Sequence, residues 1–365
     1  MKVLFWVQHL LGVGHVARAN VLAEAVRAEG VDVTMVLGGR PLPNGPRAER
    51  LPPVRATDQT FSQLVDSNAA PVTTATWNAR RDALAAIHDR IEPDVVLIEA
   101  WPFGRRPFSH ELVPLLERTR ARVAVSVRDI LHAGRKPGRA EETRDRVNAL
   151  VDLVLVHADD ELVRLRNTYP LADELTARVE HTGFVAAERA VTPRREADVV
   201  VSAGGGAFGA PLMRAATEAA SRLPDLSFLV TTGRNLDAGT RSGIAAAAPA
   251  NVRLVEHLDG LADVMAGARI SVSQAGYNTV MDLFRAQPHG VRGLLVPSDV
   301  DGQNEQATRA RLLGEAGRVQ VLPESELTAE GLAQVIERIL SSDPVLEPVD
   351  MNGARRSAEL IASLA

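Results

Sequence analysis

His15 is the residue whose surroundings most clearly suggest chemistry. It closes a loop, residues 8–15, that follows an apolar segment and leads into a helical pattern. A histidine at such a junction titrates near neutrality and can accept a proton from a hydroxyl group. Capping the helix or positioning a substrate is an equally good interpretation. The loop is not a dinucleotide-binding fingerprint, because Gly12 and Gly14 are present but Ala17 stands where the third glycine is expected.

A second glycine-containing loop covers residues 202–209, with the sequence Ser-Ala-Gly-Gly-Gly-Ala-Phe-Gly, between an apolar segment and a helical pattern. Free backbone N–H groups and the helix dipole receive phosphate in such a loop. Three consecutive glycines exceed what a tight turn requires. Gly204, Gly205 and Gly206 are therefore predicted to face a phosphate or a sugar.

A third loop, residues 273–282, has the sequence Ser-Gln-Ala-Gly-Tyr-Asn-Thr-Val-Met-Asp. A strand over 269–273 is expected to turn at Gly276 into a helix over 279–285, so that the N–H groups of residues 276–279 point at an anion. The carboxylate of Asp282 can then accept hydrogen bonds from both ribose hydroxyls of a nucleotide. Its alternative role is simple compensation of the helix dipole.

Polar side chains also gather in residues 296–306, where amides and carboxylates can hydrogen-bond sugar hydroxyls. Asp299-Val300-Asp301 spells a D-x-D metal motif, which we interpret as loop capping, and no metal is expected. Further charged residues follow predicted strands of the N-terminal half. They are Glu99, Arg105, Arg106, Arg128 and Asp129. Arginines there either bind a phosphate or carboxylate bidentately or form structural ion pairs.

These loops require a scaffold of strands and helices, and the hydrophobic pattern supplies one. Strands are expected over residues 2–7, 31–37, 94–98, 122–127 and 153–157, and again over 199–202, 227–231, 251–255, 269–273, 293–296 and 318–322, with amphipathic helical patterns between them. The alternation predicts an α/β protein of βαβ units around doubly wound parallel sheets.

The chain has 365 residues, more than one hydrophobic core usually supports. We predict two Rossmann-like domains, 1–185 and 198–347, with a linker over 186–197 and a C-terminal helical segment, 348–365, that can return to the first domain. Ligands of open parallel sheets bind beyond the carboxyl ends of the strands. The two domains are therefore expected to face a central cleft.

Composition narrows the function. The absence of cysteine excludes disulfides, thiolate zinc sites and cysteine nucleophiles. The net charge of −5 argues against nucleic-acid binding, and the pair Arg80-Arg81 is interpreted as a solvated helix face. Residues 2–7 are predicted as a buried strand and not as a secretion signal. No apolar run approaches the roughly 20 residues of a membrane-spanning helix, so we predict a cytoplasmic protein, with peripheral membrane contact left open.

Taken together, residues 7–15, 98–106, 126–130, 202–206, 273–282 and 305–310 resemble MurG-like glycosyltransferases, which have the twin-Rossmann GT-B fold and a family 28-type C-terminal domain. They are still more similar to an uncharacterised bacterial group of such enzymes. The resemblance covers nearly the whole chain. It implies transfer of a sugar from a nucleoside-diphosphate sugar, UDP-linked by preference, to a small-molecule or lipid-linked acceptor, with inversion and without a metal or other cofactor.

The resemblance also implies roles for individual residues. The catalytic base is His15, with Glu99 or Asp129 as alternates. The positions that match donor-binding segments are Gly14, Gly204, Gly205, Gly206, His257, Gln274, Gly276, Tyr277, Asn278, Thr279, Asp282, Gln303, Glu305 and Gln306. Those expected on the acceptor side are Gly12, Arg105, Arg106 and Arg128.

This sequence departs from the family's pattern in two places. Asp282 stands where the family has a glutamate, one methylene longer. The loop at Gly204 to Gly206 lacks the serine and glutamine of MurG itself, so the acceptor need not be lipid-linked muropeptide. The alternatives to a glycosyltransferase are a sugar-nucleotide 2-epimerase, which needs no acceptor, a non-catalytic sugar-nucleotide sensor and, as a weaker option, a dinucleotide oxidoreductase.

Overall fold

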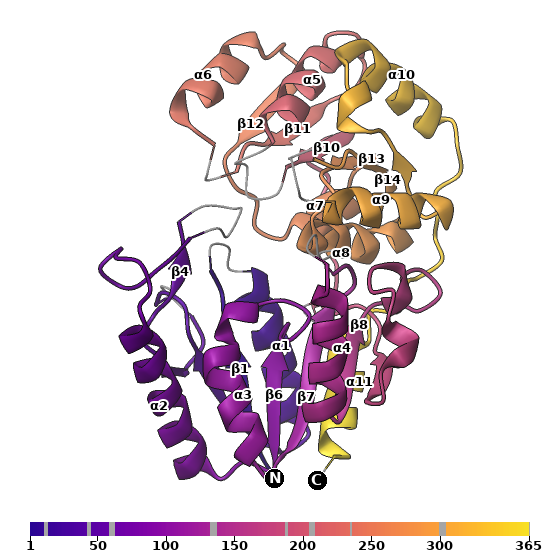
Figure 1. Cartoon of the computed structure of the whole chain (residues 1–365). Coiled ribbons are helices and arrows are strands. Elements are labelled where there is room, and N and C mark those ends of the chain that lie inside the picture. Colours follow the sequence, from indigo (N-terminus) through magenta and orange to yellow (C-terminus); the bar gives the residue numbers. More distant parts are fainter. Residues whose placement is uncertain are drawn as a thin grey trace. The chain divides into compact units, whose positions relative to one another are not determined.

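The computed structural model describes residues 1–10, 14–41, 45–57, 63–131, 137–186, 189–203, 209–233, 236–298 and 304–364. The chain divides into two compact units. Unit 1 comprises residues 1–187 together with 350–365, and unit 2 comprises residues 188–349. Each unit is built around its own parallel sheet (Figure 1).

The sheet of unit 1 has the strand order β3-β2-β1-β6-β7-β8-β9, with every neighbouring pair parallel. Its strands are β1 (Lys2–Val7), β2 (Asp32–Leu37), β3 (Glu49–Arg50), β6 (Val95–Glu99), β7 (Arg122–Arg128), β8 (Leu153–His157) and β9 (Arg178–His181). A short antiparallel pair, β4 (Arg55–Ala56) and β5 (Leu64–Val65), stands apart from this sheet. β6 and β8 are buried along their whole length, as expected for strands covered on both faces.

Helices cover both faces of that sheet. They are α1 (Gly14–Ala28), α2 (Thr74–Ile91), α3 (Ser109–Arg118), α4 (Arg139–Leu150) and α11 (Gly353–Ala362), with 3₁₀ turns η1 (Arg106–Phe108), η2 (Leu165–Asn167) and η3 (Ala172–Glu174). In the view of Figure 1, α2 and α3 stand in front of the sheet and α1 and α11 lie behind it. Ala354, Ala358 and Ile361 of α11 join the core formed by α1 and the first strands. The C-terminal helix therefore completes unit 1.

The sheet of unit 2 has the order β12-β11-β10-β13-β14-β15, again parallel throughout. Its strands are β10 (Val199–Ser202), β11 (Phe228–Thr231), β12 (Val252–Val255), β13 (Ile270–Ser273), β14 (Arg292–Leu295) and β15 (Gln320–Val321). Its helices are α5 (Ala210–Ala220), α6 (Ala238–Ala247), α7 (Leu261–Ala266), α8 (Tyr277–Ala286), α9 (Glu305–Glu315) and α10 (Ala329–Leu340), with turns η4 (Gln287–His289) and η5 (Glu324–Glu326). The predicted fold class, two doubly wound parallel sheets, is confirmed.

The strand order reverses once in each sheet, between β1 and β6 in unit 1 and between β10 and β13 in unit 2. The loops that leave the two central strands diverge at such a point, which opens a crevice for a ligand. Four of the loops that the sequence singles out follow β1, β6, β10 and β13, the strands at these two reversals. The remaining candidates, residues 128–129, 257 and 296–306, belong to the ends of β7, β12 and β14.

The segment predicted as a linker, residues 186–197, is partly built into unit 2. The Thr192 amide and the Arg189 guanidinium both bind the carboxylate of Asp263, in α7. The Arg194 amide donates to the Asp263 carbonyl at 2.8 Å. Most of this segment is therefore anchored on α7.

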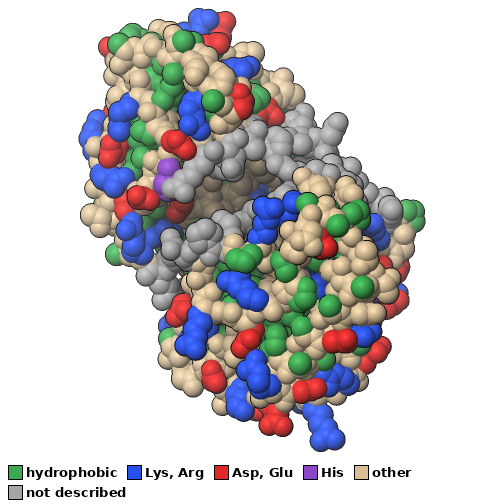
Figure 2. Space-filling model, turned by 90° about the vertical axis from the view of Figure 1, so that its left-hand side faces the viewer, with side chains coloured by type: hydrophobic (Ala, Val, Ile, Leu, Met, Phe, Trp, Pro, Cys, Tyr) green, Lys and Arg blue, Asp and Glu red, His purple; other side chains and the backbone are tan. Residues whose placement is uncertain are grey.

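Basic and acidic side chains are interspersed over the face drawn in Figure 2, which agrees with a small net negative charge. Such a surface does not concentrate the positive charge that binds nucleic acid. Within the described ranges, no helix combines the length and the apolar character needed to cross a membrane.

Candidate functional site

In unit 1, the ends of two neighbouring strands bring His15 and Glu99 together. His15 lies in the first turn of α1, after β1, and Glu99 ends β6. The imidazole Nδ1 lies 3.0 Å from Oε1 of Glu99, and Arg18, one turn further along α1, pairs with the same oxygen. The His15 side chain is 21% exposed and that of Glu99 is 1% exposed. A partly accessible imidazole is therefore backed by a buried carboxylate.

The electrostatics of this pair favour a neutral histidine. Burial lowers the pKa of His15 to about 4, and the charges of Arg105 and Arg18 act in the same direction, while the hydrogen bond to Glu99 opposes them. Burial alone would raise the pKa of Glu99, but the Arg18 charge and the hydrogen bond from His15 outweigh it and hold that pKa well below its ordinary value. Because Glu99 is an ionised acceptor, the proton of His15 is assigned to Nδ1. Nε2 then keeps a lone pair and can act as a base.

The loop after β6 holds Arg105 close to this pair. Ala100 and Arg105 both have positive φ angles, 66° and 55°, so the loop adopts a conformation that non-glycine residues rarely keep without support. The support includes hydrogen bonds from the Gly104 amide to the Ala100 carbonyl, at 2.7 Å, and from Arg105 Nε to the Gln8 carbonyl, at 3.0 Å. Burial lowers the pKa of Arg105 to about 10, and the neighbouring charge of Arg128 adds to this shift. The guanidinium groups of Arg105 and Arg18 therefore both act on His15.

Arg106 and Asp129 occupy different surroundings. The Arg106 guanidinium binds Glu142 at 2.6 Å, the Arg139 carbonyl at 2.7 Å and Thr143 at 2.9 Å, all on α4. These bonds make Arg106 a link between η1 and α4, which favours the structural interpretation of this arginine. Asp129 follows β7 and is completely buried.

The interpretation of Arg80 as part of a solvated helix face is wrong. Its side chain is fully buried and pairs with Glu111 of α3 through Nε, at 2.5 Å. It also donates to the Gln8 side chain, at 2.9 Å, and to the Gly38 carbonyl, at 2.9 Å. Trp6 donates to the same Glu111 carboxylate at 2.9 Å. This buried cluster fixes the end of β1, from which the loop to His15 departs.

In unit 2, the N-terminus of α8 is the best-formed candidate for an anion site. Gly276 is the N-cap, and the first hydrogen bond of the helix runs from the Val280 amide to the Gly276 carbonyl, at 3.0 Å. The amides of Tyr277, Asn278 and Thr279 precede that bond and have no acceptor within the helix. Among the residues that the structure describes, the nearest neighbour of a Cβ at Gly276 would be Thr279 Oγ1, at 4.0 Å. Packing against these residues does not require glycine here, which leaves space for a ligand.

Helix α9 holds the loop that precedes Gly276. The Gln306 side-chain oxygen accepts from the Ala275 amide at 3.0 Å and from the Ser298 amide at 3.2 Å. The buried Arg309 donates to the Ala275 carbonyl at 2.6 Å and to Glu305 at 2.8 Å. Glu305 and Gln306 therefore brace the loop from the side of α9, and their contact with a donor sugar stays a prediction.

Of the other donor-side residues of unit 2, Asp282 lies in α8, whereas Gln274 and His257 follow strand ends. Burial raises the pKa of Asp282 to about 6, while Arg285, 3.4 Å away, opposes this shift and Asp263 adds to it. His257 follows β12, is exposed and pairs with Asp259 at 3.2 Å. Gln274 is buried, and its amide donates to the Ser202 carbonyl at 3.0 Å. Asp282 is thus a carboxylate whose charge changes just below neutral pH.

Several predicted positions lie outside the described residues. These are Gly12, Gly204, Gly205, Gly206, Gln303 and the Asp299-Val300-Asp301 sequence. Gly14 is the first residue of α1. In the part of the chain that the structure describes, no cluster of three or more histidine and carboxylate side chains could hold a metal ion. The expectation that no metal is used stays a prediction.

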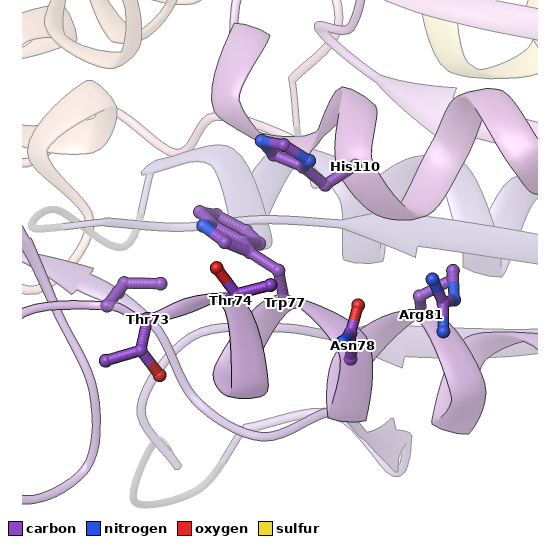
Figure 3. Close-up of a pocket in the computed structure, with 7 residues that line it drawn as sticks. Thr73, Thr74, Trp77, Asn78, Arg81 and His110 are labelled. Carbon is purple, nitrogen blue, oxygen red and sulfur yellow. The ribbon is translucent and has the colours of Figure 1, made fainter.

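A surface pocket of about 320 Å³ lies elsewhere on unit 1, between α2 and α3 (Figure 3). Its residues include Trp77, whose ring stacks on His110 at 5.4 Å between centroids, and Arg81. None of the residues predicted for catalysis or binding lines it. The candidate site residues therefore lie at the strand ends and not in this pocket.

Sequence reasoning missed three buried polar residues of the His15 region: Arg18, Ser126 and His157. Ser126 and His157 stand at or near the ends of predicted strands, and Arg18 stands one helical turn after His15. All three are polar residues in an otherwise apolar strand end or helix face. This pattern identifies them as neighbours of His15 and Glu99 only when the order of the strands is known.

The fold defines the class of protein. Over the whole chain, the structure is similar to that of MurG from Acinetobacter baumannii, with a TM-score of 0.65 and 16% sequence identity, and 100% of both chains covered. It is also similar to the calicheamicin glycosyltransferase CalG4, with a TM-score of 0.64, 16% identity and coverage of 100% of this chain and 95% of the other. Two parallel-sheet α/β units in this arrangement of elements give the chain the GT-B fold of these glycosyltransferases.

The sequence comparisons find similarity over part of the chain. Residues 199–364 match the glycosyltransferase family 28 C-terminal domain, so the C-terminal half of the chain carries a domain of this kind. A relative from Thiobacillus denitrificans is 30% identical over 200 residues, or 53% of this chain and 52% of the relative. It is a UDP-N-acetylglucosamine--N-acetylmuramyl-(pentapeptide) pyrophosphoryl-undecaprenol N-acetylglucosamine transferase. The transferase of the same name from Thermoanaerobacter sp. (strain X514) is 32% identical over 106 residues, or 29% and 28%. The chain thus spans about a quarter to a half of the length of these curated relatives.

Proposed function

We propose that the protein is a glycosyltransferase that moves a sugar from a nucleoside-diphosphate sugar, with UDP as the preferred nucleotide, to an acceptor hydroxyl. The observation that carries this proposal is the start of α8. The N–H groups of its first turn and the space at Gly276 lie inside the segment that matches the family 28 C-terminal domain. Backbone amides at a helix N-terminus are well suited to a diphosphate.

The chemistry that these residues support is a direct displacement. Nε2 of His15 accepts the proton of the acceptor hydroxyl as its oxygen forms a bond to the anomeric carbon, and the bond from that carbon to the diphosphate oxygen breaks. Negative charge then grows on the leaving diphosphate. The amides at the start of α8 stabilise that charge without a metal, and attack opposite the leaving group inverts the anomeric carbon.

Glu99 supports the base. Its carboxylate holds His15 in the Nδ1–H form and stabilises the imidazolium that forms during the reaction. Arg105 and Arg128 add positive charge nearby, which suits an acceptor bearing a phosphate or carboxylate. A lipid-linked acceptor of the kind named for the MurG-like relatives has that chemistry.

Nucleotide binding tests the donor site. The purified protein is screened by thermal shift against UDP, GDP, TDP and their sugar conjugates, without metal and then with Mg²⁺. We expect a rise in Tm with one nucleotide series in the absence of metal, because a ligand that binds only the folded state stabilises it. The rise is reduced in Asp282→Ala and kept in Asp225→Ala, an exposed aspartate ahead of β11. No response to any nucleotide at millimolar concentration contradicts the donor site.

Product analysis separates the alternatives. A transferase converts the sugar nucleotide only when an acceptor is present, whereas an epimerase changes it alone. A sensor binds without turnover, and its His15→Ala variant behaves like the wild type.

A further inference from the structure

Behind Glu99 a line of buried polar side chains continues away from His15. Ser126, in β7, lies with Oγ 2.8 Å from Glu99 Oε2 and 2.8 Å from Nε2 of His157, at the end of β8. On the far side of the ring, Nδ1 of His157 lies 3.0 Å from Oγ1 of Thr182, just after β9. Ser126, His157 and Thr182 are all completely buried. The line therefore crosses the ends of four neighbouring strands.

We propose that Ser126 and His157 are positioning residues, which fix the carboxylate of Glu99 and through it the Nδ1–H form of His15. This inference rests on the proposed role of His15 as the base. It adds two residues, and a defined arrangement of protons, that neither the sequence nor the comparisons assign.

The arrangement of protons follows from counting donors. Ser126 has one hydroxyl proton, and it can go either to Glu99 or to His157. A hydrogen bond to an ionised acceptor is roughly twice as strong as one between neutral groups, so the proton goes to the carboxylate. The Ser126 oxygen must then accept from His157, which places the proton of His157 on Nε2. Its Nδ1 in turn accepts from the Thr182 hydroxyl.

The opposite arrangement is available to the chain but is less favourable. Thr182 can donate to the Gly183 carbonyl, at 3.1 Å, or to the Val156 carbonyl, at 3.3 Å. His157 could then donate through Nδ1 and accept the Ser126 proton at Nε2. Oε2 of Glu99 would lose its hydroxyl donor, and a buried carboxylate oxygen without a donor is costly. The charge of Glu99 therefore selects the first arrangement.

A protonated His157 is excluded by its surroundings. Burial lowers the pKa of this histidine to about 3, the Arg18 charge acts in the same direction, and Glu99 opposes both. The charged groups that act on it are thus Arg18, from α1, and Glu99, from β6. At neutral pH His157 is a neutral donor with a fixed proton and not a second acid.

The arrangement gives Glu99 a donor on each oxygen. Oε1 accepts from His15 and Arg18, and Oε2 accepts from Ser126. With both oxygens held, the carboxylate cannot rotate away from His15 when the imidazole takes up a proton. Small displacements of a catalytic group can cost about a hundredfold in rate, so the loss of this support should lower kcat and leave KM nearly unchanged.

The test combines kinetics with a readout that needs no turnover. Ser126→Ala and His157→Met should lower kcat about tenfold to a hundredfold, whereas His157→Gln, whose amide can still donate toward Ser126, should keep most of it. In parallel, ¹⁵N NMR of the imidazole groups in the resting protein should show His157 protonated at Nε2 and His15 at Nδ1. Thr182→Val, which nearly preserves the shape of residue 182, should leave the His157 proton on Nε2, because Ser126 and the charge of Glu99 still select that form.

The outcomes separate this inference from the proposed function. If no acceptor is turned over, the NMR spectra still decide the proton arrangement. A His157 signal from the Nδ1–H form in the wild type overturns the proposal, and so does a Ser126→Ala variant with full kcat. Circular dichroism and Tm of each variant show whether it is folded. Should Ser126→Ala not fold, His157→Met and His157→Gln carry the same comparison.

Discussion

The strand ends of unit 1 present ionisable side chains, whereas the best-formed site of unit 2 presents backbone amides. His15 and Glu99 depend on buried charge and on the position of one proton. The start of α8 depends on helix geometry and on the lack of a side chain at Gly276. The first region should therefore respond most to changes of chemical group, and the second to changes of shape.

Removal of the base should have the largest effect. His15→Ala should lower kcat about a hundredfold to ten-thousandfold, the usual contribution of a general base, while the donor Kd stays unchanged because the proposed donor site lies in unit 2. The control is His110→Ala, which alters an exposed histidine on α3. Steady-state kinetics and nucleotide titration check both variants. A weaker donor affinity in His15→Ala would show that the His15 region of unit 1 also takes part in donor binding.

Loss of the Glu99 charge should come next. Glu99→Gln leaves the buried Arg18 without its anionic partner, and breaking such a pair costs roughly 3–5 kcal/mol of stability. Where the variant is folded, kcat should fall and the pKa of His15 should fall further, because Glu99 raises it. Chemical denaturation and NMR titration of His15 measure the two effects. An unchanged His15 pKa would show that Glu99 does not act on the imidazole.

Two glycine substitutions sharpen the contrast in unit 2. Within the described part of the chain, a Cβ at Gly276 would meet nothing nearer than 4.0 Å, whereas a Cβ at Gly209 would lie 2.1 Å from the Cβ of Ala203. Gly276→Ala should leave Tm nearly unchanged and weaken nucleotide binding about tenfold, since a methyl group would occupy the space for the diphosphate. Gly209→Ala should cost about 1–3 kcal/mol by overpacking. Normal nucleotide binding in Gly276→Ala would show that the diphosphate does not bind in that space.

The smallest effect is a pH dependence of donor binding. The pKa of Asp282 is raised to about 6, mainly by burial, so the carboxylate is ionised at pH 7 and protonated at pH 5. An ionised carboxylate accepts both ribose hydroxyl bonds, so the donor affinity should fall severalfold as the pH drops from 7 to 5. The same shift makes the folded state favour the protonated form, which lowers stability as pH rises from about 4 through 6. Calorimetry of Asp282→Asn, whose affinity should not change with pH, checks the assignment.

The fold could be predicted well because buried parallel strands have a strong pattern. The strands expected over 2–7, 153–157 and 199–202 have those bounds in the structure. β9 (Arg178–His181) was missed because it is an edge strand with alternating polar residues and no buried run. β3, β4 and β5 have two residues each, too few for a periodic signal.

The site could be predicted only in part, because its contacts join distant residues. His15 and Glu99 were each identified, but their contact depends on β1 and β6 being neighbours, a fact of strand order. Arg80 looked like a surface residue, since the sequence does not show that Glu111 lies against it. His157 ends β8 and is buried, and its contact with Ser126 depends on β7 and β8 being neighbours.

The packing of α11 against α1 has a consequence for how the protein is made. Unit 2 is a continuous stretch of chain, but unit 1 is assembled from residues separated by all of unit 2. During synthesis the apolar face of α1 stays exposed until residues 353–362 have left the ribosome. All residues of unit 2 leave the ribosome before them. We therefore expect the later-made unit to reach its native state first, and ribosome-bound chains ending near residue 349 to be cut by protease in unit 1 while unit 2 resists.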